Sequence, residues 1–175
     1  GVFRIRQVNG TEQEPFIVKA QNQGKAVLTG HSWIMVEDST YVVIEGLRFE
    51  TIGVADNMGV RLQDTYHSRV TRNEFALQLP AGTEENTKYV FVGSSKWEKK
   101  PVDTSMGFVY VWHGYGGTEE RNRIDHNRFV DMLHPGNFVA VDAPYVQIDH
   151  NEFRNIPYRP GTNGLEAVRI GNSQK

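Results

Sequence analysis

Two stretches of the sequence nearly repeat one another: residues 121–129 read RNRIDHNRF, and residues 145–153 read YVQIDHNEF. Both contain Ile-Asp-His-Asn with a Phe two residues later, and they begin 24 residues apart. Two earlier stretches fit the same frame, HSRVTRNEF at residues 67–75 and YVVIEGLRF at residues 41–49. Self-similarity of this kind is typical of a solenoid, in which each repeat buries its apolar side chains against its neighbours.

The four copies begin 26, 54 and 24 residues apart. We interpret the 54-residue interval as two turns of about 24 residues, one of which carries a short insertion. The chain of 175 residues would then make about seven coils. A chance recurrence of IDHN in an ordinary β-sandwich is the alternative, and the three Asn and four Phe in register argue against it.

The apolar runs of the sequence predict strands. They are four to six residues long, rich in β-branched and aromatic residues, and end at Gly, Asn, Asp or Pro. A helical repeat needs about ten or more residues with a period of about 3.6, and none is found. In each copy an aliphatic residue and the Phe five positions later are expected to face a common interior. These pairs are Ile44 and Phe49, Val70 and Phe75, Ile124 and Phe129, and Ile148 and Phe153.

Asn73, Asn127 and Asn151 occupy one position of the frame, where a turn is expected. Asn tolerates left-handed backbone geometry, and stacked Asn side chains can satisfy one another's amide groups. We therefore expect these residues to form a stack that links the coils.

A second family of apolar strands lies beside the repeated frame, at residues 108–112, 138–142 and 167–171. Near-continuous apolar runs are typical of parallel strands that are covered on both faces. The two families together predict an all-β fold, a parallel β-helix with two faces per coil. We expect residues 1–175 to form one such domain, with a loop insertion at about residues 80–106. The lysines of that insertion suit either an acidic sugar or a solvated hairpin.

The composition excludes several classes of function. With 19 basic and 21 acidic residues, the net charge of −2 offers no general attraction to nucleic acid or to an anionic membrane. No apolar run approaches the roughly 18 residues of a membrane span, and the chain shows no signal peptide. There is no cysteine, so disulfides and thiolate chemistry are excluded.

Residues 163–171 read NGLEAVRIG and follow the second IDHN copy. Together with the two copies, this segment resembles the chondroitinase B-like and alginate lyase family of calcium-dependent polysaccharide lyases, which carry a similar Asn-Gly-x-Glu-x-x-Arg-x-Gly segment. The resemblance implies a right-handed parallel β-helix that cleaves a uronate-containing acidic polysaccharide by β-elimination. Alginate is the first substrate that it suggests, and chondroitin or dermatan sulfate is the next.

The resemblance also assigns residues to a site. Asn163 matches an asparagine that ligates calcium, which is the expected cofactor, and Glu166 and Arg169 match residues that line the substrate groove. Tyr158 and Arg159 join the substrate-binding group because they lie in the densest polar segment of the chain, and Arg suits bidentate binding of a carboxylate. The alternative at these positions is an ordinary Asn-Gly turn and a surface ion pair.

In the family, the acidic calcium ligands, the lysine base and the assisting arginine lie in coils after this segment, whereas the sequence ends at Lys175. No catalytic residue is therefore assigned, and we expect the chain to be the N-terminal part of a longer enzyme, incomplete at its C-terminal end. A positioned acid or base contributes roughly 10²–10⁴ in rate, so this part alone should be nearly inactive. The complete protein is expected to be secreted or periplasmic and monomeric.

Two other functions stay open. A short β-helix with an arginine-rich side can bind an acidic polysaccharide without cleaving it. A β-helix glycoside hydrolase, or a metal site other than calcium, is suggested by His113, His134 and the recurring His126 and His150. Because the recurring pair follows the coil period, a stacked structural role is the simpler interpretation.

Overall fold

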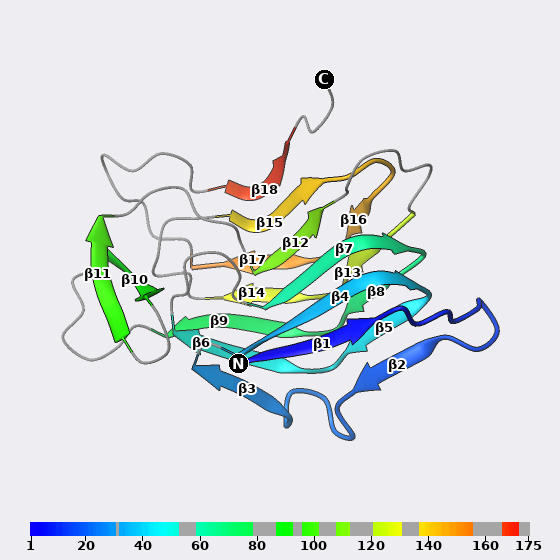
Figure 1. Cartoon of the computed structure of the whole chain (residues 1–175), viewed down its shortest axis with the longest axis horizontal. Helices are drawn as coiled ribbons and strands as arrows, with labels where there is room; N and C mark the ends of the chain where they lie inside the picture. The colour runs from blue at the N-terminus through cyan, green and yellow to red at the C-terminus, as the bar shows by residue number, and fades with distance from the viewer. Residues whose placement is uncertain are drawn as a thin grey trace.

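The protein is a right-handed parallel β-helix, as the sequence predicts, with three parallel sheets that run along the stack of coils (Figure 1). The structure is a computed structural model that describes residues 1–30, 32–52, 59–78, 87–92, 96–101, 108–112, 121–130, 137–155 and 166–171. Every regular element in these ranges is a strand. Accordingly, the described part of the chain contains no helix that could cross a membrane.

In the described residues, sheet A has six strands, and sheets B and C have five each. Sheet A pairs β1 (Val2–Arg6), β4 (Trp33–Thr40), β7 (Val60–Tyr66), β12 (Val109–Trp112), β15 (Asn137–Asp142) and β18 (Glu166–Ile170). Sheet B pairs β2 (Phe16–Lys19), β5 (Val42–Glu45), β8 (Arg69–Thr71), β13 (Arg123–Asp125) and β16 (Gln147–Asp149). Sheet C pairs β3 (Val27–Gly30), β6 (Arg48–Ile52), β9 (Glu74–Gln78), β14 (Arg128–Val130) and β17 (Glu152–Arg154).

The repeated frame supplies two of the three sheets, so the prediction of two faces per coil is wrong. The aliphatic half of each frame lies in sheet B and the Phe half lies in sheet C, as β13 and β14 illustrate. The chain bends between them at a left-handed residue, with φ of 54° at Arg72, 54° at His126 and 52° at His150. The left-handed position is thus one residue before the Asn to which the sequence assigned it.

The Asn residues form the expected stack along the corner between sheets B and C. Asn127 donates from Nδ2 to the carbonyl of Val70 at 2.9 Å and to Asn151 Oδ1 at 3.0 Å. Its own Oδ1 accepts from the backbone N–H of Asn73 at 3.0 Å. Asn73 and Asn151 each make the corresponding bond to a carbonyl of the preceding coil. Because Asn73 and Asn127 are buried, these bonds satisfy polar groups that water cannot reach.

The 54-residue interval is one turn of the helix. β8 pairs directly with β13, with Val70 beside Ile124, so no other coil lies between them. The prediction of two turns is therefore wrong, and the described residues form parts of six coils rather than seven. The extra length lies between β9 and β12, where β10 (Thr87–Val92) and β11 (Lys96–Pro101) form an antiparallel hairpin apart from the three sheets (Figure 1). The rest of the predicted insertion lies outside the described residues.

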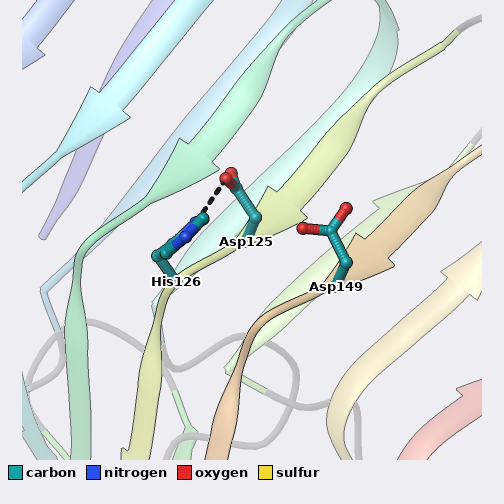
Figure 2. Close-up of side chains that lie close together, drawn as sticks. All are labelled: Asp125, His126 and Asp149. Carbon is teal, nitrogen blue, oxygen red and sulfur yellow. Dashed lines mark hydrogen bonds and ion pairs between the residues drawn. The ribbon is translucent and has the colours of Figure 1, made fainter.

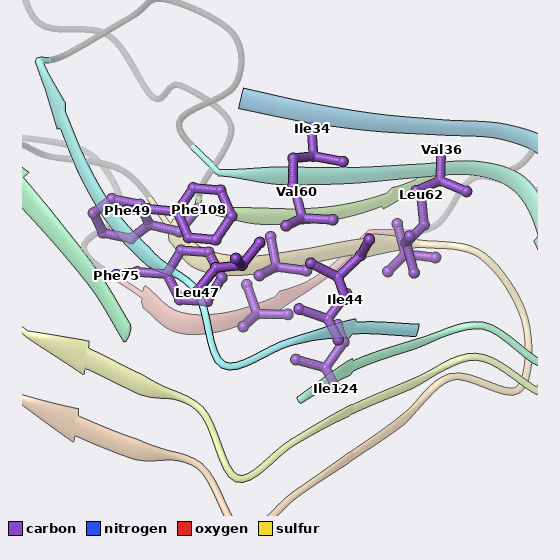
Figure 3. Packing of buried hydrophobic residues seen from close by; sticks show 14 of the residues in the cluster. Ile34, Val36, Ile44, Leu47, Phe49, Val60, Leu62, Phe75, Phe108 and Ile124 are labelled. Atoms are coloured by element: carbon purple, nitrogen blue, oxygen red, sulfur yellow. The ribbon is translucent and has the colours of Figure 1, made fainter. Parts of the chain in front are cut away.

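Stacked aliphatic and aromatic side chains fill the interior (Figure 3). Phe49, Phe75 and Phe129 are fully buried, and their ring centroids are 4.8 and 4.9 Å apart from one coil to the next. Ile44 and Ile124 are fully buried in the same core, as the sequence predicts. This arrangement holds the register, because a slip of one residue would turn the outward charged side chains into the core.

Candidate functional site

One row of side chains crosses the outer face of sheet A from coil to coil. The register places Arg61 of β7 beside Tyr110 of β12, and Tyr110 beside Ala140 of β15. Ala140 in turn lies beside Arg169 of β18. These side chains point away from the core because they alternate with the core-facing residues of the same strands. Arg169 is exposed and Arg61 is half-buried, whereas Tyr110 and Ala140 are 5% and 6% exposed. Since neighbouring strands are about 4.8 Å apart, the backbones of Arg61 and Arg169 are separated by roughly 14 Å.

Arg61 packs against two aromatic rings of this face. Its guanidinium carbon lies 5.4 Å from the centroid of the Tyr110 ring and 5.5 Å from that of Trp112. Its Nε atom is buried without a hydrogen-bond partner. A guanidinium placed over a ring keeps its N–H edge available for a planar anion, so these contacts orient Arg61 without neutralising it. Among the described residues, Arg61 and Arg169 have no carboxylate partner within ion-pair distance.

The Tyr110 hydroxyl completes the row by donating a hydrogen bond to Asp142 Oδ2 at 3.1 Å. Burial, together with the negative charge of Asp142, raises the pKa of Tyr110 to about 12. The phenol is therefore neutral near pH 7 and acts as a hydrogen-bond donor. This geometry orients Asp142 and suits ligand binding rather than proton abstraction by Tyr110.

Two of the five predicted site residues lie in the described part of the chain. Glu166 begins β18, and Arg169 is the fourth residue of that strand and has an exposed side chain. The structure thus brings Arg169 onto the same face as Arg61. Asn163, Tyr158 and Arg159 lie outside the described residues, so the roles assigned to them stay predictions.

Sequence reasoning missed Arg61, Tyr110, Trp112 and Asp142, which come from three different coils. The sequence contains a signal for them, because each lies in a strand where a polar or aromatic residue alternates with buried aliphatic ones. Using that signal requires knowing which strands stack and in which register. Because the sequence predicts two turns over the 54-residue interval, β7 and β12 are not expected to be neighbours.

A second cluster of polar side chains lies on the outer side of sheet B, where ligand atoms of Asp125, His126 and Asp149 come within 4.8 Å of one another (Figure 2). His126 Nδ1 lies 2.7 Å from Asp125 Oδ2, and His150 Nδ1 lies 2.8 Å from Asp149 Oδ1. The two imidazole rings stack with their centroids 4.9 Å apart. The recurring His residues therefore stack along the coils, as expected.

Arginines already compensate both carboxylates of this cluster. Arg69 binds Asp125 through Nε at 2.7 Å and through Nη2, and Arg123 binds Asp149 through the same two atoms at 3.1 and 2.9 Å. Burial alone would raise the pKa of Asp125, but hydrogen bonds from Arg69 and His126 outweigh it and hold that pKa below its usual range. A hydrogen bond from Arg123 is the main cause of the lowered pKa of Asp149.

This chemistry does not fit calcium. Ca²⁺ takes about six to eight oxygen ligands, whereas the cluster offers two arginine-bound carboxylates and an imidazole nitrogen. A cation would also have to displace or approach the guanidinium groups of Arg69 and Arg123. The cluster therefore links neighbouring coils of sheet B.

Comparison with known proteins identifies the family. The sequence profile described as Chondroitinase B matches residues 3–175. Among solved structures, the chain is similar to an alginate lyase from Paenibacillus sp. str. FPU-7, at 16% identity and a TM-score of 0.38. That match covers 87% of this chain and 66% of the lyase, so the chain spans less than two thirds of the lyase's length. No curated protein matches the chain significantly. Since the profile extends over almost all of the sequence, the chain belongs to the chondroitinase B family.

Proposed function

We propose that this chain forms the scaffold and part of the substrate groove of a polysaccharide lyase that cleaves a uronate-containing acidic glycan. The observation that carries the proposal is the outer row of sheet A, where Arg61 and Arg169 stand on either side of Tyr110 and Ala140. Guanidinium groups bind carboxylates through two parallel N–H bonds, and a uronate chain presents a carboxylate on every sugar. Membership of the chondroitinase B family supports the same substrate class.

In β-elimination, a base removes the proton on the carbon beside the sugar carboxylate, and the glycosidic oxygen leaves to form a carbon–carbon double bond. Calcium, when bound with Asn163 as one ligand, would neutralise the carboxylate and so ease loss of that proton. The described residues contribute to the binding part of this reaction, since Arg61 and Arg169 attract and orient the acidic sugar. We expect the lysine base and the assisting arginine in coils that follow β18. Alginate is the first substrate to test, and chondroitin or dermatan sulfate is the second.

A non-catalytic module that holds an acidic polysaccharide is the second candidate. The same row of sheet A supports it, because the row offers cationic and aromatic groups for binding and its phenol is not suited to act as a base. For either function we propose that the protein acts outside the cytoplasm, in secreted or periplasmic form and as a monomer, because its polymeric substrate is extracellular.

The test measures the ultraviolet absorbance of the 4,5-unsaturated uronate when the 175-residue chain meets alginate with calcium, beside a chain extended at its C-terminus. We expect product from the extended chain and retention of both chains in an alginate-containing gel. Retention of both chains without product from either would establish the binding module. A new reducing end without a double bond would instead identify a hydrolase, and product from the short chain would place a base and an acid within residues 1–175.

The double variant Arg61→Gln/Arg169→Gln tests the row itself in the extended chain. Each lost charge-assisted hydrogen bond is worth about 1.5–3 kcal/mol, so the loss of two should lower kcat/KM for alginate by roughly a hundred-fold or more. Lys19→Gln/Arg154→Gln is the matched control, because it removes the same charge from exposed positions outside sheet A. Equal losses in the two double variants would contradict a specific role for the row.

A further inference from the structure

A pocket opens at the corner between sheets B and C, on a different side of the β-helix from the outer face of sheet A. Its volume is about 380 Å³. Side chains from successive coils line it, among them Gln23, Leu47, Arg72, Glu74, His126 and Arg128. None of these residues belongs to the row proposed to bind substrate on sheet A.

The coil geometry explains why a pocket forms here. The left-handed corner position is occupied in successive coils by Gly46, Arg72, His126 and His150. Side chains at this position point out from the corner. Because Gly46 has no side chain, the line of corner side chains is interrupted beside Arg72. The buried Leu47 and the exposed Gln23 of the first coil also line the pocket.

Hydrogen-bond donors exceed acceptors around this pocket. Arg72 bonds to Glu45 through Nη1 at 2.9 Å, and Arg128 bonds to Glu74 through Nη1 at 2.6 Å. His126 uses Nδ1 for Asp125, which leaves its Nε2 directed away from that carboxylate. Within the described residues, no partner is found for Arg72 Nη2, Arg128 Nη2 or His126 Nε2.

The acceptors of the pocket are already engaged. Glu74 is the one carboxylate among the lining residues, and its two oxygens bind Arg48 at 2.8 Å and Arg128 at 2.6 Å. Glu45 and Glu152 also bind Arg72 and Arg128 and balance their charges, so the pocket would hold a ligand through its remaining N–H donors rather than through a net charge. A ligand rich in acceptor oxygens fits this arrangement, and a cation does not.

We propose that this pocket is a second binding site for acidic glycan, which takes the carboxylate of a uronate between Arg72 and Arg128. The choice of a uronate rests on the proposed function, whereas the excess of donors is a property of the pocket itself. A second site on the same rigid coil stack raises the effective concentration of polymer at the protein without any change to the sheet A groove. The side chains of Arg72 and Arg128 are 51% and 45% exposed, so binding should weaken as salt screens their charges.

The experiment is electrophoresis of the folded chain in native gels that contain alginate, neutral dextran or no polymer. We expect alginate alone to retard the chain. The double variant Arg72→Gln/Arg128→Gln should raise the apparent dissociation constant for alginate about ten-fold. A wild-type chain that alginate does not retard, or that dextran retards equally, would overturn the proposal.

Two sets of controls separate binding in this pocket from general electrostatic attraction and from loss of the fold. Lys19→Gln/Arg154→Gln removes the same charge outside the pocket and should leave the retardation within about two-fold of wild type. If it weakens binding as much as Arg72→Gln/Arg128→Gln, the effect is general attraction and the pocket has no role. Gln23→Ala alters an exposed loop residue of the pocket, so it probes the site without endangering the fold. It should weaken binding by a few-fold, and wild-type retardation by this variant would contradict the proposal.

The result of the alginate gel experiment on the pocket does not depend on the result of the lyase assay. Arg61→Gln/Arg169→Gln removes the sheet A row and should leave the contribution of Arg72 and Arg128 measurable by the same gel. Absence of unsaturated product from the C-terminally extended chain, together with loss of alginate retention through Arg72→Gln/Arg128→Gln, would refute the lyase and support the pocket. Product from the extended chain, together with wild-type alginate binding by Arg72→Gln/Arg128→Gln, would support the lyase and refute the pocket.

Discussion

Asn73, Asn127 and Asn151 show how single polar residues fasten one coil to the next. All three donate to a backbone carbonyl of the preceding coil, but Asn73 and Asn127 are buried and Asn151 is only half-buried. A hydrogen bond contributes little when water can replace it and much when its loss leaves a buried group unpaired. The energetic importance of the stack should therefore follow burial rather than the number of bonds.

Asn127→Ala is expected to lower the free energy of unfolding by about 3 kcal/mol. The change leaves the buried backbone N–H of Asn73 without its acceptor and removes one donor from the carbonyl of Val70. Urea denaturation followed by circular dichroism measures the effect. Asn151→Ala is the matched control and should cost clearly less, and equal losses at the two positions would show that burial does not set the contribution.

The ion pair of Asp125 should make the free energy of unfolding depend on pH. Its pKa is lower in the folded protein than in the unfolded chain, so its contribution is complete above about pH 4 and is lost as pH falls through the folded value. Asp125→Asn should cost about 2 kcal/mol at pH 7, and the difference from wild type should shrink below about pH 4. Denaturation at a series of pH values, with the exposed Glu12→Gln as control, tests this. A difference that is constant with pH would exclude the ion pair as its cause.

At the scale of strands, β7 and β12 lie side by side from their first residues, where the N–H of Val60 donates to the carbonyl of Phe108 at 2.8 Å. Gly59 precedes β7, and a Cβ atom on it would lie 2.4 Å from the carbonyl oxygen of Phe108 and 2.6 Å from the ring of Phe75. Both contacts are shorter than packing allows. The absence of a side chain at Gly59 is therefore what permits this stretch of sheet A to pack on the phenylalanine stack.

Gly59→Ala should accordingly destabilise the protein by about 1–3 kcal/mol, because one methyl group must push apart a backbone carbonyl and a buried ring. Gly1→Ala provides the control, since nothing lies within 4 Å of the added atom there. Thermal unfolding should show a lower midpoint for Gly59→Ala and no change for Gly1→Ala. A wild-type midpoint for Gly59→Ala would mean that β7 and β12 are less closely packed than described.

The whole molecule behaves as a stack in which each coil contacts its neighbours, because every pairing in sheets A, B and C joins adjacent coils. Each central coil packs between two neighbouring coils. The first coil exposes Phe3, Phe16 and Ile17, which are 54%, 42% and 46% accessible, since among the described residues a coil covers it on one side alone. Stability should therefore decrease from the centre of the stack toward its described ends.

Amide hydrogen exchange tests this gradient. Protection should be greatest in β7, β8 and β9, intermediate in β13 and β14, and lowest in β1, β2 and β18. Each added neighbouring coil supplies further hydrogen-bond and packing partners to a strand, which is why the centre should open last. Uniform protection along the stack would instead indicate that all coils unfold as one cooperative unit.

The parallel β-helix, the Asn stack and the stacked Phe core could be predicted from the sequence, because these features repeat with the coil and appear as a local pattern of residue types. The sequence also identified Arg169 as a candidate binding residue. Only the folded structure showed that the 54-residue interval is one turn, that the three frames with Asn bend at the residue before it, and that Arg61 and Tyr110 share a face with Arg169. These features depend on which strands pair although they lie far apart in the sequence. Pairing is set by the packing of whole coils against one another, and no short stretch of sequence contains that information.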